Sequence, residues 1–232
     1  MKQKAEPEIL YRYRSLSSSF ANTLIEITGW LWLSRAEGLN DPFDGLRYAK
    51  KIQGTLLEEK KINIPLDYIW SIACFTTKWN NPTMWAHYAN NYKGICLGYD
   101  KIELDEHVEI ENKPTVSYTT QGAFLEPMKY VSNIPENFNT PIEPLTIKTK
   151  NWEYEDEWRL GLLEVYGNAN ISDNGTQHFL KKGLKEIIFS EHINTNELRI
   201  LKKIAEMTNP SIKFYKINFA DGKRKIIRNE YK

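Results

Sequence analysis

Cysteine is scarce in this sequence: the 232 residues include only Cys74 and Cys96. The two lack the Cys-x-x-Cys spacing that zinc sites use. Each lies in an apolar stretch typical of a strand, a setting that favours a buried thiol. We therefore expect reduced cysteines in a cytoplasmic protein rather than a zinc centre.

An excess of charge of one sign is also missing, because 31 basic and 30 acidic side chains leave a net charge of +1. Nothing global favours a polyanion or a membrane surface, so nucleic acid would have to be bound locally. No apolar run approaches the roughly 20 residues that span a bilayer. We expect a soluble protein without a membrane partner, and its oligomeric state stays open.

The common enzyme motifs are absent as well. The sequence has no Gly-x-Gly-x-x-Gly, no Gly-x-x-x-x-Gly-Lys and no Gly-x-Ser-x-Gly, which argues against Rossmann, P-loop and hydrolase-elbow sites. The four histidines, His87, His107, His178 and His192, have no paired ligand spacing. They are expected at the surface or the core edge and predict no metal site.

Aromatic residues, in contrast, are abundant, with 13 Tyr, 7 Trp and 9 Phe in a chain that is 41% hydrophobic. This content suits a packed core and also stacking pockets for a base. Apolar strand-like runs alternate with helical spacings, which predicts a single α+β domain with a mostly antiparallel mixed sheet and surrounding helices. Residues 1–8 are expected to be frayed, and about 120–150 to form a lid-like loop.

The most unusual stretch, Trp152 to Leu160, holds four carboxylates, two Trp, one Tyr and one Arg. Buried charge is costly unless it is paired. Read as a strand, its aromatic residues form a core face, and a cleft wall is formed by Glu153, Glu155, Glu157 and Arg159. The alternative is a helical turn that pairs Glu155 with Arg159. The apolar run that follows favours a strand from about Glu157 onward.

Aromatic and basic residues alternate near the N-terminus. This alternation predicts a strand with Tyr11 and Tyr13 on one face and Arg12 and Arg14 on the other. Two interpretations of the arginines stay open. They could form a solvated strand face or a bidentate clamp on a phosphate or a carboxylate.

Two further stretches carry candidate residues. The Asn-Asp-Pro-Phe-Asp segment is turn chemistry, and its carboxylates Asp41 and Asp44 are a weak signal for a cation. Helical spacing follows in Met-Trp-Ala-His-Tyr. There Trp85 is expected to pack in the core, whereas His87 and Tyr88 have polar tips that could meet a ligand.

Seven motifs occur in the order Leu10–Arg14, Leu31–Ser34, Leu39–Asp44, Cys74–Thr76, Met84–Ala89, Lys93–Tyr99 and Trp152–Arg159. In this order they resemble the bacterial family of unknown function called DUF2971. The resemblance covers about residues 10–190 and implies one DUF2971-like domain over 1–232. The family name implies no activity.

A weaker likeness is to the ADP-ribosyltransferase plan, which has an early basic strand, a central aromatic helix and strand, and a late glutamate opening a strand. It implies that NAD is the cofactor and is bound by Tyr11, Arg12, Tyr13, Arg14, Trp85 and His87. It also implies that Tyr88 stacks on nicotinamide and that Glu157 bonds the ribose and stabilises the oxocarbenium ion. Glu155 is the other catalytic candidate, and the sequence does not decide which of Glu153, Glu155 and Glu157 has the catalytic role.

This resemblance implies an ADP-ribosyltransferase-like enzyme, a phage-defence or toxin effector that modifies nucleic acid or protein. It requires the late acidic segment, the early Tyr-Arg strand and the central aromatic helix to share one hollow. One rival is a metal-dependent hydrolase or nuclease in which Asp41, Asp44, Glu155 and Glu157 converge. The other is a non-catalytic binding or sensor module whose charged motifs are structural.

Overall fold

The computed structural model describes residues 6–35, 38–41, 44, 68–111, 123–135, 138, 140, 142–165, 171–172, 175–180, 183–220 and 225–231. The chain forms two compact units. The first consists of Met1–Leu31, Phe75–His107 and His178–Lys232, and the second of Trp32–Cys74 and Val108–Gln177.

The first unit contains eight complete elements among its described residues. They are β1 (Ile9–Arg14), α1 (Leu16–Ile27), α3 (Pro82–Tyr88), β4 (Ile95–Asp100), β11 (Leu184–Phe189), α5 (Thr195–Thr208), β12 (Lys213–Ala220) and β13 (Lys225–Glu230). Four elements cross the boundaries between the units in sequence: β2 (Trp30–Arg35), β3 (Tyr68–Thr76), α4 (Lys101–Glu111) and β10 (Gly175–Phe179).

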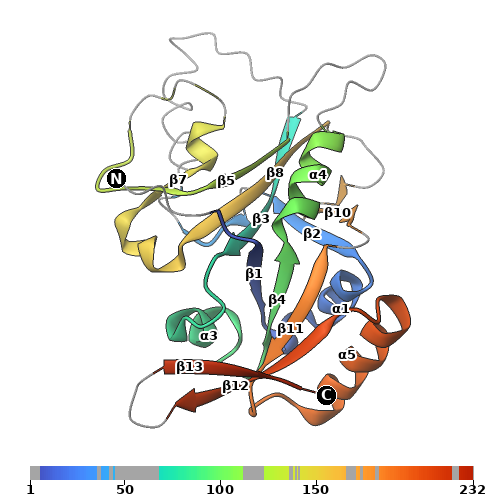
Figure 1. Cartoon of the computed structure of the whole chain (residues 1–232). Coiled ribbons are helices and arrows are strands. Elements are labelled where there is room, and N and C mark those ends of the chain that lie inside the picture. Colours follow the sequence, from blue (N-terminus) through green and yellow to red (C-terminus); the bar gives the residue numbers. More distant parts are fainter. Residues whose placement is uncertain are drawn as a thin grey trace. The chain divides into compact units, whose positions relative to one another are not determined.

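The strands of the first unit follow the order β13-β12-β11-β4-β1. Their neighbours pair antiparallel except for β11 and β12, which are parallel. Figure 1 shows α1 and α5 on one side of these strands and α3 on the other. On α5 the buried residues are Leu201 and Ala205, four positions apart and therefore on the same side of the helix, which packs toward the core.

Close backbone packing explains why a glycine, Gly94, directly precedes β4. A Cβ on Gly94 would lie 2.1 Å from the carbonyl oxygen of Arg14, a distance that no side chain tolerates. The glycine therefore lets the chain return from α3 directly against β1, and this contact places the α3 segment beside the strand.

The second unit contains β5 (Ala123–Pro127), β6 (Lys129–Val131), the 3-10 helix η2 (Glu143–Leu145), β7 (Ile147–Thr149), the 3-10 helix η3 (Lys150–Glu155), β8 (Glu157–Val165) and β9 (Ile171–Ser172). β8 pairs with β5 and with β3, and β6 pairs parallel with β7. Its apolar core includes Ile72, Phe124 and Leu145, with Trp70 packed against them.

The predicted mixed α/β structure with mostly antiparallel strands is confirmed, whereas its likeness to ADP-ribosyltransferases and its organisation as one domain stay predictions. The lid-like loop over about 120–150 is wrong as a loop, because its described residues include β5, β6, η2 and β7. Phe124 of β5 and Leu145 of η2 pack into the apolar core of the second unit and are not solvated as the side chains of a loop would be. Residues 6–8 have no helix or strand, and 1–5 lie outside the described residues. None of the helices described here has the length and apolar character needed to cross a bilayer.

Candidate functional site

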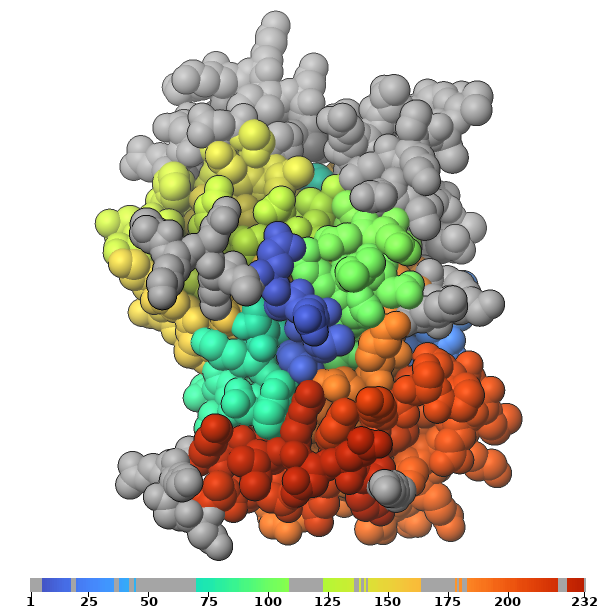
Figure 2. All heavy atoms as spheres, viewed as in Figure 1, coloured from blue at the N-terminus to red at the C-terminus, as the bar shows by residue number. Residues whose placement is uncertain are grey.

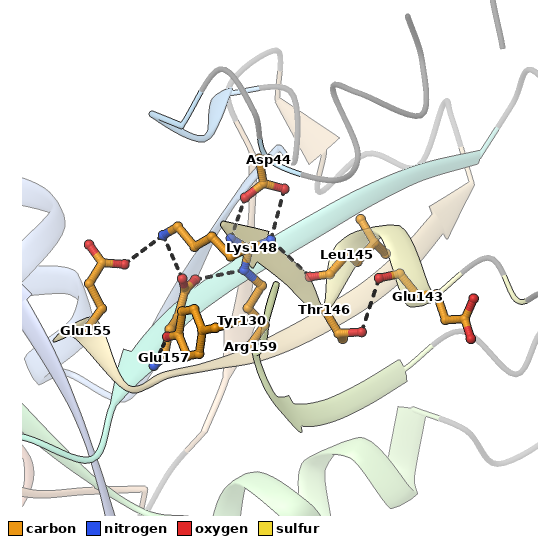
Figure 3. Close-up of polar contacts among 9 residues, drawn as sticks. All are labelled: Asp44, Tyr130, Glu143, Leu145, Thr146, Lys148, Glu155, Glu157 and Arg159. Carbon is orange, nitrogen blue, oxygen red and sulfur yellow. Dashed lines mark hydrogen bonds and ion pairs between the residues drawn. The ribbon is translucent and has the colours of Figure 1, made fainter. Parts of the chain in front are cut away.

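The late acidic segment of the second unit is built around Arg159, whose side chain is only 1% exposed (Figure 3). Its Nε donates to Glu157 Oε1 at 2.7 Å. Its Nη1 and Nη2 donate to the two carboxylate oxygens of Asp44 at 3.1 and 2.5 Å, and Nη1 also donates to the Leu145 carbonyl at 2.9 Å. The arrangement with Asp44 is the bidentate fork that guanidinium groups form best.

A second buried cation, Lys148 on β7, lies between two glutamates. Its Nζ donates to Glu155 Oε2 at 2.6 Å and to Glu157 Oε2 at 2.8 Å. The same ammonium lies 4.7 Å from the ring centroid of Trp152, within cation–π range. Both carboxylate oxygens of Glu157 are therefore bound to cations, one to Lys148 and one to Arg159.

The cations hold the carboxylate of Glu157 ionised. Burial alone would raise the pKa of Glu157, but Arg159 and Lys148 outweigh it and lower that pKa to about 2. Burial alone would likewise lower the pKa of Lys148, and its two glutamates raise it instead. Burial, reinforced by nearby Glu157, raises the pKa of Cys74 to about 12. None of these groups exchanges a proton near neutral pH.

This network of Asp44, Lys148, Glu155, Glu157 and Arg159, here called the ion-pair network, joins segments that are distant in the chain. Through Lys148 it joins β7 to η3 and β8, and through Arg159 it joins β8 to Asp44 (Figure 3). A general base needs a pKa near the working pH and access to its substrate. With a pKa of about 2 and a side chain 4% exposed, Glu157 has neither property.

The sequence prediction for this segment is partly wrong. A strand from Glu157 onward is confirmed by β8, but residues 150–155 form a 3-10 helix. Asp156, in the left-handed region at φ 48°, lies between that helix and the strand. The alternative of a helical pair between Glu155 and Arg159 is wrong, because Glu155 pairs with Lys148 and Arg159 with Asp44 and Glu157. The faces are also reversed, because paired Glu157 and Arg159 are buried and Trp158 is half-buried.

The early arginines of the first unit bind a carboxylate of the chain itself. Arg12 donates to Glu26 at 3.0 Å, and Arg14 donates to both oxygens of Glu26, through Nε at 2.9 Å and through Nη2. Glu26 lies on α1 and is 1% exposed. The arginines therefore hold α1 against β1, and the solvated strand face is wrong for Arg12, which is buried; a clamp on a ligand stays a prediction.

Tyr11 and Tyr13 point to the opposite face of β1, as strand alternation requires. Tyr13 packs edge-on to Trp85 with ring centroids 5.2 Å apart and donates from its hydroxyl to the Lys78 carbonyl at 2.8 Å. Trp85 is wholly buried, which confirms its predicted core packing. Tyr11 faces a separate group of residues described below.

The polar pair on α3 is more accessible. His87 is exposed and Tyr88 is half-buried, and their ring centroids lie 6.2 Å apart. Of the predicted site residues, those near Tyr11 and Trp85 belong to the first unit and Glu155 and Glu157 to the second. The hollow that these pieces were expected to share stays a prediction.

The metal-dependent hydrolase alternative requires its carboxylates to converge on a metal ion. Three of them, Asp44, Glu155 and Glu157, instead bind the side chains of Lys148 and Arg159. Arg159 separates Asp44 from Glu157, and Lys148 separates Glu157 from Glu155. In the part of the chain that the structure describes, no three His, Cys, Asp or Glu side chains are grouped to hold a metal ion. Asp41 is 1% exposed, and residues 42 and 43 lie outside the described part.

A further group in the first unit surrounds Arg228 of β13. Its guanidinium carbon lies 4.4, 4.8 and 6.0 Å from the ring centroids of Tyr215, Trp79 and Tyr11, and Nη1 donates to Glu186. We call these five residues the Arg228 site. The Arg228 side chain is 24% exposed, so one side of this charged, ring-lined group meets solvent.

The surroundings of the Arg228 site keep Tyr11 neutral and Arg228 charged. Burial and then the charge of Glu186 raise the pKa of Tyr11, so its hydroxyl keeps its proton. Burial would lower the pKa of Arg228, but the bond with Glu186 raises it. A Cβ on Gly98 would lie 2.5 Å from Glu186 Cγ, so glycine makes room for this carboxylate.

Sequence reasoning found only Tyr11 of this site. The other four residues come from the loop before α3, from β11, from β12 and from β13. The register of the strands brings them together, with Glu186 opposite Gly98 and Ile188 opposite Tyr215. The chain carries no local signal for such long-range pairing; Gly98 alone indicates a close approach.

The comparisons with known proteins support one resemblance. The model of the family described as protein of unknown function (DUF2971) matches residues 84–160. The matched segment begins in α3 and ends on β8, so it includes residues of both units. No curated protein and no solved structure matches the chain significantly.

Proposed function

We propose that the protein is a binding module for a nucleotide or a dinucleotide, with NAD as the first candidate, and that the Arg228 site recognises it. The observation that carries this proposal is the guanidinium of Arg228, which is held among three aromatic rings and is partly open to solvent.

The chemistry of the site suits this class of ligand. A guanidinium presents a planar fork of donors that matches two phosphate oxygens, and its bond to Glu186 fixes the orientation of that fork before binding. The half-buried rings of Trp79 and Tyr215 offer surfaces on which a nicotinamide or adenine ring can stack. A dinucleotide supplies both a ring and phosphates.

Binding without ADP-ribosyl transfer is favoured by the state of the candidate catalytic acids. Transfer to nucleic acid or protein would require Glu157 to approach the ribose as a free carboxylate. Its two oxygens are instead engaged by Lys148 and Arg159 at 2.8 and 2.7 Å. Freeing it would leave two buried cations with fewer partners, at a cost of several kcal/mol.

Calorimetric titration of NAD into the protein tests this proposal, with two substitutions at one position. Tyr215→Ala removes the ring 4.4 Å from Arg228 and is expected to weaken binding about tenfold. Tyr215→Phe retains the ring and serves as the matched control. Thermal unfolding of all three proteins checks that the fold is intact.

Three outcomes decide the result. Weak binding by the alanine variant and normal binding by the phenylalanine variant support the site. Equal binding by wild type and both variants would show that NAD does not use the Arg228 site. Absence of binding of NAD, ADP and AMP to the wild-type protein would refute the proposed function itself.

A further inference from the structure

A groove beside α5, on the surface of the first unit, is not used by the proposed function. It has a volume of about 520 Å³ and is lined by Arg199, Lys202, Lys203, Glu206 and Tyr231, among others. We call it the α5 groove. In Figure 2, α5 (orange-red) and the C-terminal strands (red) lie side by side on the face shown.

The helix itself groups these charges. Arg199, Lys202, Lys203 and Glu206 are spaced by three, one and three residues, so they occupy neighbouring positions on one side of α5. Leu201 and Ala205 are the residues that the helix buries. Three cations and one carboxylate line the groove, which gives it a local excess of two positive charges on a chain with a net charge of +1.

One cation is already positioned by aromatic rings. Lys202 Nζ lies 4.9 Å from the ring centroid of Tyr231 and 5.8 Å from that of Phe214. The Tyr231 ring packs edge-on against Phe189 with centroids 5.1 Å apart, yet Tyr231 remains 41% exposed. The groove therefore combines a fixed ring with an accessible face and three positive charges.

The α5 groove and the Arg228 site are separate. Phe214 and Tyr215 are consecutive residues of β12, so their side chains point to opposite faces of the strand. Lys202 lies over Phe214, whereas Arg228 lies over Tyr215. Lys202 of the groove therefore lies toward one face of β12, and Arg228 lies toward the other.

We infer that the α5 groove binds a nucleoside phosphate. The cations recognise phosphate oxygens, and the exposed ring of Tyr231 can stack on a base. The volume of about 520 Å³ falls within the roughly 300–1,000 Å³ of small-molecule sites. A nucleic-acid strand fits less well, because backbone binding relies on many cations along an extended surface and the whole chain has almost no net positive charge.

The test compares two double variants with the same change of net charge. Arg199→Gln with Lys203→Gln neutralises two cations of the groove, and glutamine keeps a high helix propensity. Lys93→Gln with Lys129→Gln neutralises two exposed lysines outside it. Calorimetry measures the binding of ATP, of adenosine and of inorganic phosphate to each protein at fixed ionic strength.

The groove variant is expected to bind ATP at least about tenfold more weakly than wild type, and the control variant about as tightly as wild type. Binding of ATP together with weaker binding of phosphate and adenosine supports a nucleoside phosphate. Binding of phosphate as tight as that of ATP would mean that the site takes free phosphate and would overturn the base-stacking role of Tyr231.

Two other results would overturn the inference. One is unchanged ATP affinity in the groove variant, and the other is absence of ATP binding with retained, groove-dependent binding of a single-stranded oligonucleotide. The inference does not depend on the proposed function: because the Arg228 site also takes nucleotides, the two double variants are compared in the Tyr215→Ala background, where ATP binding that is lost with Arg199→Gln and Lys203→Gln reports the groove alone. Failure of either site is therefore seen separately.

Discussion

Replacing Arg159 by methionine is expected to destabilise the second unit strongly. The substitution removes a fully buried guanidinium that bonds Glu157, both oxygens of Asp44 and a backbone carbonyl. Methionine has a similar length but leaves Asp44 without its fork and leaves Glu157 with Lys148 alone. Removing one partner of a buried ion pair typically costs about 3–5 kcal/mol, so we expect a loss of that size at pH 7.

The pH dependence distinguishes lost ion pairing from lost packing. In the wild type the pKa of Glu157 is lowered from 4.5 to about 2, and a depressed carboxyl pKa stabilises the fold above the ordinary pKa and loses this effect as the pH falls through the folded one. At about 1.4 kcal/mol per pKa unit, this is worth about 3 kcal/mol. Without Arg159 the pKa of Glu157 rises, so the difference between variant and wild type should shrink between pH 4.5 and 2.

Urea unfolding followed by circular dichroism from pH 7 to pH 3 measures this difference. Lys185→Met is the matched control, because Lys185 pairs with Asp100 through side chains that are 38% and 26% exposed, and such an ion pair is expected to be worth no more than about 1 kcal/mol. The double variant Asp44→Asn with Arg159→Met should recover part of the loss, since it leaves one buried charge fewer. A loss below about 1 kcal/mol at pH 7, or a loss that stays constant down to pH 3, would refute the reasoning.

Three further predictions concern packing and helix ends. Because burial raises the pKa of both free thiols, that of Cys74 to about 12, neither Cys74 nor Cys96 should react with a thiol reagent at pH 8 until the protein is unfolded; rapid labelling of the native protein would contradict this. Gly94→Ala would place a Cβ 2.1 Å from a carbonyl oxygen of β1, so we expect a loss of about 1–3 kcal/mol in urea unfolding, and unchanged stability would show that the strand can shift. Asn194→Ala removes an N-cap that accepts hydrogen bonds from two α5 amides and should cost about 1 kcal/mol, whereas Ser15→Ala, at an N-cap whose side chain makes no capping bond, should change stability little; equal losses would be inconsistent with the capping geometry.

Local patterns in the sequence predicted the local structure well. The alternation of Tyr and Arg in β1 places Tyr13 against Trp85 and Arg12 against Glu26, as the period of a strand requires. The apolar run after Glu157 is β8. These features depend on neighbouring residues, which a single sequence displays directly.

Long-range pairing is what the sequence could not display. The partner of Arg159 is Asp44, 115 residues away, and the carboxylate held by Arg12 and Arg14 lies on a helix that follows them. A cluster of acids read by itself suggests catalysis. In the fold the same acids are paired with buried cations, and only the fold reveals those pairings.

The region around residues 120–150 shows the same limit. Its prolines favour a loop, and Pro127 is nevertheless the last residue of β5, where a missing amide donor costs little. Lys148, which the sequence does not single out, is the second cation of the ion-pair network. Its importance depends on the turn at Asp156, whose left-handed backbone brings Glu155 and Glu157 to the same ammonium.

The central claim is that the acids of the ion-pair network stabilise the fold, whereas the Arg228 site recognises the ligand. Titration of NAD into two variants tests this claim most directly. The variants are Glu157→Gln and Tyr215→Ala, each first confirmed as folded by circular dichroism. Glu157→Gln should be less stable but bind NAD within about twofold of wild type, and Tyr215→Ala should bind about tenfold more weakly. Loss of binding in a folded Glu157→Gln protein, with Tyr215→Ala unaffected, would contradict this assignment and place the ligand at the acids.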